Sequence, residues 1–137
     1  MIRSCAVVLC VLLALACTKQ KPEDALRLRI SQYEQYWAAK NLEEVWKVMS
    51  PRLQQGNDNN SAKFQEFVRN SGTLIARIQV QDIRVIGDQG TVRALVTYRS
   101  PAGEELGDEV EESKWIFRNG EWFFDDYRSV TEPSEKR

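Results

Sequence analysis

The spacing of hydrophobic residues changes at Gly72, and this change constrains the fold more than any other feature of the chain. Before Gly72, apolar residues recur every three or four positions, which is typical of helices that bury one face. After Gly72, apolar and polar residues alternate, which is typical of strands. Helices followed by strands predict an α+β fold, with helices packed on an antiparallel sheet.

Three helices are predicted in the N-terminal half. The first opens at Pro22, because proline suits the first turn of a helix. Asn41 caps the second, and Pro51 stops its pattern. A polar loop over residues 54–60 follows, and Ser61 caps the third. The apolar stripes of the three are Leu26, Ile30, Tyr33 and Trp37; Leu42, Val45, Trp46 and Met49; and Phe64, Phe67 and Val68.

A long, bulged hairpin is predicted after Gly72. The apolar positions of its first strand change parity between Val80 and Ile83. Only an extra residue at Gln81/Asp82 keeps both halves on one face. With Asp88-Gln89 as a two-residue turn, the pairs are Val85 with Val92, Ile83 with Ala94, Val80 with Val96 and Ile78 with Tyr98.

A second hairpin is predicted at Arg118-Asn119-Gly120-Glu121, since Asn-Gly favours a type I′ turn. Counting back from this turn pairs Phe117 with Trp122, Trp115 with Phe124 and Lys114 with Asp125. The first two pairs predict an aromatic wall in the core. The third predicts a surface ion pair of small value.

Residues 1–17 are typical of an export signal. Arg3 precedes an uncharged, mostly apolar run that is too short to cross a membrane as a helix. The stretch Leu13-Ala14-Leu15-Ala16-Cys17 resembles the lipobox of bacterial lipoproteins, whose cysteine receives a diacylglycerol. The resemblance implies a signal peptide over residues 1–16, a lipidated Cys17, and a tether over residues 17–23.

A lipid on Cys17 implies a membrane as partner, because several acyl chains hold a protein stably on a bilayer. The location implied is a bacterial cell envelope. In the enterobacterial rule, Asp next to the lipidated cysteine retains a lipoprotein at the inner membrane. Thr18 stands there instead, which implies the outer membrane and a domain facing the periplasm. Two alternatives stay open: an ordinary secretory signal cut after Ala16, and an uncleaved membrane anchor.

Composition excludes several classes of chemistry. The chain has no histidine, which excludes Ser-His-Asp catalysis and histidine-based metal sites. Its cysteines stand at positions 5, 10 and 17, so the domain beyond them has no thiol chemistry. A net charge of −1 argues against a nucleic-acid partner. We expect neither a cofactor nor a metal.

A cluster of acidic residues surrounds Gly103 and Gly107. Its members are Glu104, Glu105, Asp108, Glu109, Glu111 and Glu112. Calcium prefers several oxygen ligands, but the spacing matches no known calcium loop. We favour a solvated hairpin end that discourages edge-to-edge pairing of strands.

Four segments together resemble the nuclear-transport-factor-2-like superfamily: Tyr36–Asn41, Val45–Pro51, Val80–Ala94 and Lys114–Phe124. The resemblance covers residues 24–130 and leaves residues 131–137 as a loose tail. It implies a cone in which three helices pack on a bent meander of about four long strands. Members include ketosteroid isomerases, dehydratases, polyketide cyclases, transport factors and lipoproteins, so the fold does not fix an activity.

No catalytic motif of that superfamily matches this chain, so no catalytic residue is assigned. The candidate pocket-lining residues are Tyr36, Trp37, Trp46, Asp82, Tyr98 and Trp115. The competing interpretation makes the aromatic residues core and Asp82 a solvent-facing acid at a kink. Asp125 and Asp126 form a further acid pair, for which a surface role is favoured.

We favour a non-catalytic binding or assembly module, with an envelope protein or a second copy of the chain as its partner. The alternative is a small cone-fold enzyme of the isomerase, dehydratase or cyclase kind, or a carrier of apolar ligands. A hollow cone with a buried carboxylate or tyrosine at its base would favour the alternative. A cone plugged by Trp37, Trp46, Tyr98 and Trp115 would favour the module.

Overall fold

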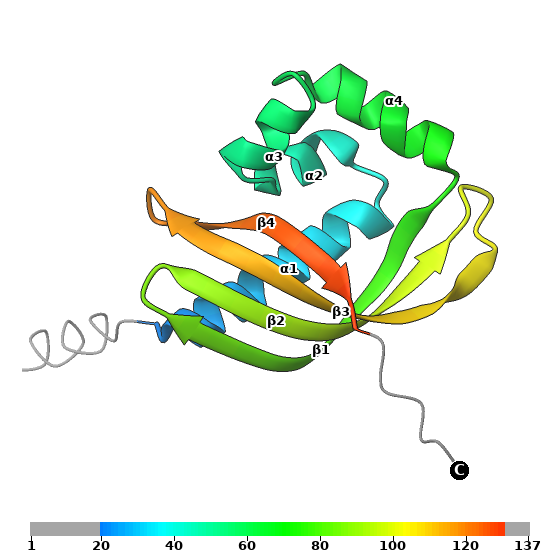
Figure 1. Cartoon of the computed structure of the whole chain (residues 1–137). Helices are drawn as coiled ribbons and strands as arrows, with labels where there is room; N and C mark the ends of the chain where they lie inside the picture. Colours follow the sequence, from blue (N-terminus) through cyan, green and yellow to red (C-terminus); the bar gives the residue numbers. More distant parts are fainter. Residues whose placement is uncertain (1–19, 131–137) are drawn as a thin grey trace, which may run out of the picture.

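The computed structural model describes residues 20–130 and places all helices before all strands (Figure 1). The helices are α1 (Pro22–Ala38), α2 (Leu42–Val48), α3 (Pro51–Gly56) and α4 (Ser61–Ser71). The strands are β1 (Leu74–Ile86), β2 (Gln89–Arg99), β3 (Glu105–Arg118) and β4 (Glu121–Ser129). They form one antiparallel sheet in the order β1-β2-β3-β4, which confirms the predicted α+β class.

Several predictions concern residues outside the described part of the chain. These are the signal peptide over residues 1–16, the lipidation of Cys17, the start of the tether, and the tail over residues 131–137. Within residues 20–130, no helix is both long enough and apolar enough to span a membrane.

The helices follow the predicted stripes, with one additional helix and one exception, since Phe67 of the third stripe is 68% exposed. All four stripe residues of α1 are buried, and the side chain of Asn41 caps α2 by accepting the Glu44 N–H at 3.4 Å. The short helix α3 occupies part of the predicted polar loop, because the Ser50 side chain caps it and proline stands in its first turn. Asn60, and not Ser61, caps α4 by accepting the Lys63 N–H at 3.2 Å.

The first hairpin has the predicted bulge but a different register. The irregularity lies between Val80 and Asp82, as expected. The turn, however, is Gly87-Asp88 and not Asp88-Gln89, because Gly87 adopts φ +60°, and type II′ turns place glycine first. Every pair therefore shifts by two residues and keeps its face: Ile83 with Val92, Val80 with Ala94, and Ile78 with Val96.

The second hairpin matches its prediction near the turn. Asn119 and Gly120 both have positive φ, at 52° and 80°, as a type I′ turn requires. The predicted pairs of Phe117 with Trp122 and Trp115 with Phe124 are confirmed. The Lys114–Asp125 pair is wrong, since a register shift next to Trp115 places Lys114 opposite Asp126. Asp125 instead accepts a hydrogen bond of 2.6 Å from Ser50 Oγ and pairs with Arg52.

The core lies between the helices and the concave face of the sheet. Trp115 and Trp122 of the predicted aromatic wall are buried in it. The Tyr33 ring from α1 packs edge-on against Trp115 at 5.6 Å and stacks on Phe124 at 5.5 Å. Aromatic contacts of this kind fix α1 against β3 and β4.

Candidate functional site

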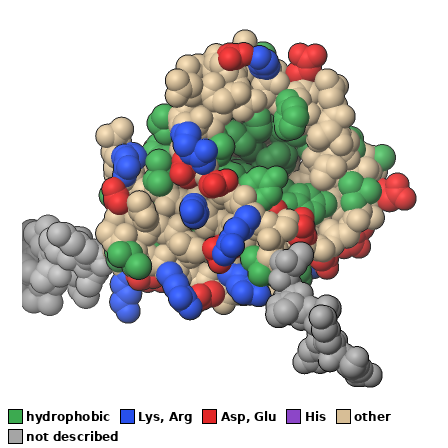
Figure 2. All heavy atoms as spheres, viewed as in Figure 1, with side chains coloured by type: hydrophobic (Ala, Val, Ile, Leu, Met, Phe, Trp, Pro, Cys, Tyr) green, Lys and Arg blue, Asp and Glu red, His purple; other side chains and the backbone are tan. Residues whose placement is uncertain are grey.

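A cavity of about 350 Å³ lies between the helices and the concave face of the sheet. Residues from α1, α4 and all four strands line it, together with Met49 and Thr73. Figure 2 shows hydrophobic side chains gathered in a hollow between α4 and the sheet. Pockets for small molecules start at roughly 300 Å³. The cone is therefore hollow and large enough for a small ligand.

Strand alternation explains which side chains line the cavity. On β2, every second residue faces inward, from Val92 through Ala94 to Tyr98. On β3, the inward positions are Glu111, Ser113 and Trp115. Glu111 lies directly opposite Ala94 across the ladder. The sequence thus places a carboxylate beside a small residue on a mainly apolar inner face.

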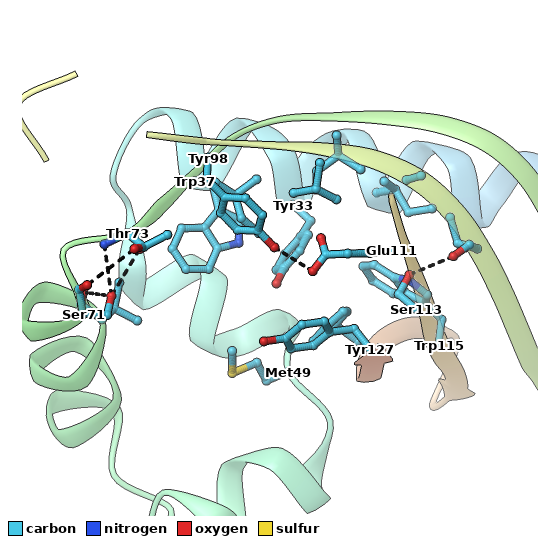
Figure 3. Close-up of a pocket in the computed structure, with 18 of the residues that line it drawn as sticks. Tyr33, Trp37, Met49, Ser71, Thr73, Tyr98, Glu111, Ser113, Trp115 and Tyr127 are labelled. Atoms are coloured by element: carbon cyan, nitrogen blue, oxygen red, sulfur yellow. Dashed lines mark hydrogen bonds between the residues drawn. The ribbon is translucent and has the colours of Figure 1, made fainter. Parts of the chain in front are cut away.

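Glu111 is the main polar feature of the cavity. Its side chain is buried, with 6% of the residue exposed, and its Oε1 accepts a 2.6 Å hydrogen bond from the Tyr98 hydroxyl (Figure 3). Burial raises the pKa of the Glu111 carboxyl, and the nearby Glu109 raises it further, while the Tyr98 bond opposes both effects. Burial also raises the pKa of the Tyr98 phenol, and Glu111 adds to that rise. Tyr98 therefore donates a hydrogen bond to a carboxylate whose charged form is disfavoured by burial and by the nearby Glu109.

Other polar groups reach the same space. Within the part of the chain that the structure describes, the indole N–H of Trp37 finds no hydrogen-bond acceptor of suitable geometry, although the residue is only 7% exposed. Ser113 Oγ accepts the Trp115 N–H at 3.0 Å and so satisfies the second indole of the cavity. Burial raises the pKa of the Tyr33 phenol, an effect that the nearby Trp37 side chain partly offsets. In Figure 3, Tyr33, Tyr98 and Tyr127 lie around Glu111.

The structure brings together three of the six candidate pocket-lining residues. Trp37, Tyr98 and Trp115 line the cavity. Trp46 packs against the Phe64 ring at 5.5 Å and does not line it. Tyr36 is half-buried against the core. Asp82 lies exposed at the bulge and pairs with Arg84 at 3.1 Å.

The expectation of a solvated acidic cluster is wrong for Glu111. This residue is buried in the cavity, whereas the other members of the cluster do not line it. A signal for this was present, because Glu111 and Trp115 are four positions apart on one strand face. Within residues 20–130, no three Asp or Glu side chains converge as a metal site.

Comparison with known proteins identifies the fold. No protein-family description and no curated protein matches the sequence. A SEC-C motif containing protein from Rhodopseudomonas palustris matches in structure with a TM-score of 0.58 and 20% identity, over 85% of this chain and 86% of its own. A protein from Exiguobacterium sibiricum, described as a Ca/calmodulin-dependent kinase II association domain, has a TM-score of 0.60 at 12% identity, over 85% and 99% of the two chains.

A third similar structure is described by its fold. It is a protein of unknown function with a cystatin-like fold from Nostoc punctiforme, which matches with a TM-score of 0.55 and 10% identity over 85% of this chain and 97% of its own. Identities this low support a shared fold and nothing about activity. The chain has the cystatin-like, nuclear-transport-factor-2-like fold, as the sequence resemblance implied.

Proposed function

We propose that this protein binds a small apolar ligand inside the cone. The observation that carries the proposal is the cavity itself, which is lined mainly by aliphatic and aromatic side chains and holds one buried carboxylate. Binding sites for small molecules combine a largely apolar lining with a few polar groups that orient the ligand. The hollow cone therefore favours the carrier alternative over a plugged assembly module.

The side chains at the rim of the cavity suit the entry of an apolar ligand from solvent. Phe67 on α4 and Tyr127 on β4 line the cavity and are both strongly exposed. Large apolar side chains exposed around a concave site are typical of ligand-binding surfaces. An apolar ligand would cover these two rings as it enters.

Filling the cavity is expected to weaken ligand binding. Leucine in place of Ala94 would project into the space beside Glu111, so affinity for the neutral apolar probe N-phenyl-1-naphthylamine should fall by about tenfold or more, measured by fluorescence titration. Leu95→Phe is the matched control, because position 95 alternates to the opposite face of β2 and is not part of the lining. A folded Ala94→Leu variant that binds the probe like the parent protein would refute the proposal.

One observation favours a second candidate, an enzyme that uses the same cavity. Glu111 is a buried carboxyl group with a raised pKa and a hydroxyl partner, and such groups can transfer protons to or from a bound substrate. Mass spectrometry of a recovered ligand distinguishes the two roles, since a carrier returns the ligand unchanged and an enzyme converts it.

We further propose that Cys17 carries a lipid that anchors the protein to the outer membrane, with the domain in the periplasm. The lipobox-like stretch supports the anchor. Because α1 begins at Pro22, the chain between the lipid and the domain would be short, and the cavity would stay near the bilayer. Apolar ligands are concentrated in such a membrane.

Loss of the thiol is expected to remove the lipid. Cys17→Ser should abolish labelling of the protein by radioactive palmitate in the native host, because the serine hydroxyl does not replace the acylated sulfur. Cys10→Ser is the control, since Cys10 lies inside the predicted signal peptide and should leave labelling intact. Continued labelling of Cys17→Ser would contradict the anchor.

A further inference from the structure

The charge inside the cavity restricts the chemistry of its ligand. Among the residues of the described range 20–130 that line the cavity, Glu111 is the only carboxylate, and none is a lysine or an arginine. A carboxylate or phosphate on the ligand would therefore meet a like charge and no compensating cation. A protonated nitrogen would find a partner of opposite charge in a site where water screens the interaction poorly.

The walls around Glu111 also favour a cation. Eight aromatic side chains of the described residues line the cavity: Tyr33, Trp37, Phe64, Phe67, Tyr98, Trp115, Phe124 and Tyr127. Aromatic faces attract cations through the negative centre of the ring, and several rings around one position add their effects. The cavity thus combines one carboxylate with aromatic walls and excess apolar surface.

We propose, building on the ligand-binding function above, that the cavity selects apolar organic amines. The hydrocarbon or aryl part of the ligand packs against the apolar walls, and its protonated nitrogen pairs with the carboxylate of Glu111. Tyr98 holds that carboxylate in place by its hydrogen bond to Oε1. The ligand's ammonium group then offsets the cost of keeping a carboxylate out of water.

Affinity for an amine should depend on pH in a defined direction. The titratable groups that face Glu111 are Tyr98 on β2, Tyr33 on α1, Tyr127 on β4 and Glu109 on its own strand. At acidic pH, Glu111 is neutral and binds an ammonium weakly. Affinity should rise as pH increases through the Glu111 pKa and fall again when the amine loses its proton at about pH 10.

Calorimetry with three ligands of one chain length tests the proposal on the full domain. Octylamine, octanol and octanoate share their hydrocarbon part and differ in head-group charge. At about pH 7.5, octylamine should bind about tenfold more tightly than octanol, and octanoate should bind most weakly. The affinity for octylamine should fall on going to about pH 4, whereas that for octanol should stay constant.

Two variants separate the role of Glu111 from a general charge effect. Glu111→Gln should remove the preference for octylamine over octanol and retain octanol binding. Glu109→Gln removes the same charge from an exposed position two residues away on β3, outside the cavity lining, and should keep the preference. If Glu111→Gln fails to fold, the pH dependence of the parent protein decides.

The outcomes distinguish this inference from the function on which it rests. Equal affinities for octylamine and octanol, tighter binding of octanoate, or an amine preference that survives in Glu111→Gln would overturn the amine proposal and leave apolar binding standing. Failure to bind the neutral naphthylamine probe and all three octyl ligands would refute the binding function itself.

Discussion

Trp122→Ala is expected to lower the free energy of unfolding by about 3–5 kcal/mol. Trp122 is only 4% exposed, and it packs beside α1 where β2 and β4 approach the helix. Its ring lies 5.3 Å from the Phe117 ring, its partner across the hairpin. Alanine would leave a void that the rigid hairpin and α1 cannot close, so both the transfer and the cavity contributions are lost.

Denaturant unfolding followed by far-UV circular dichroism measures this loss. Phe117→Ala is the matched control, because Phe117 is the cross-strand partner of Trp122 and is 39% exposed. Its truncation should cost about 1 kcal/mol, since much of its ring already contacts water. A loss below about 1 kcal/mol for Trp122→Ala, or equal losses for the two variants, would show that burial of Trp122 does not contribute to the stability of the core as argued.

The pairing of Phe117 with Trp122 could be predicted from the sequence, because the turn beside it sets the register of the two strands. Asn119-Gly120 admits one turn type, so counting outward from it pairs Phe117 with Trp122 and Trp115 with Phe124. Beyond Trp115 the count fails. Asp125 is drawn out of register by contacts with Ser50 and Arg52, which lie far away in sequence. Local patterns do not encode such contacts.

The first hairpin shows a second limit. A register with Gly87-Asp88 as the turn and one with Asp88-Gln89 differ by two positions on β2. Since strands alternate with a period of two, both registers bury the same faces, and hydrophobicity cannot choose between them. The backbone conformation of Gly87 decides, because it takes up the positive φ that a type II′ turn needs first.

The site was predictable only in part. Trp37, Tyr98 and Trp115 could be assigned to the inner face from periodicity, but whether they fill the cone or surround a space depends on packing at the scale of single methyl groups. Glu111 was concealed by its acidic neighbours. Glu111 is buried because it lies on the same face of β3 as Trp115, even though its neighbours in the sequence are charged.

The second large effect is expected at Gly90, where β2 passes under α1. Gly90→Val should destabilise the fold by about 3 kcal/mol, although valine suits strands better than glycine does. A Cβ atom at this position would lie 2.6 Å from Leu26 Cδ2 and 3.4 Å from the Trp122 ring. Leu26 is fully buried in a close-packed core, so either its side chain leaves its present rotamer or the strand and the helix move apart, and each response costs packing.

A double-mutant cycle with Leu26→Ala separates this clash from a general intolerance of substitution. Leu26→Ala alone should cost about 2–5 kcal/mol, but it removes the atom that valine meets. The double variant should therefore be more stable than the sum of the two losses predicts, by about 1 kcal/mol or more. Gly56→Val, at a position with open space around it, should change stability by only about 0.5 kcal/mol. Strictly additive losses would mean that close approach of α1 to β2 is not what requires glycine at position 90.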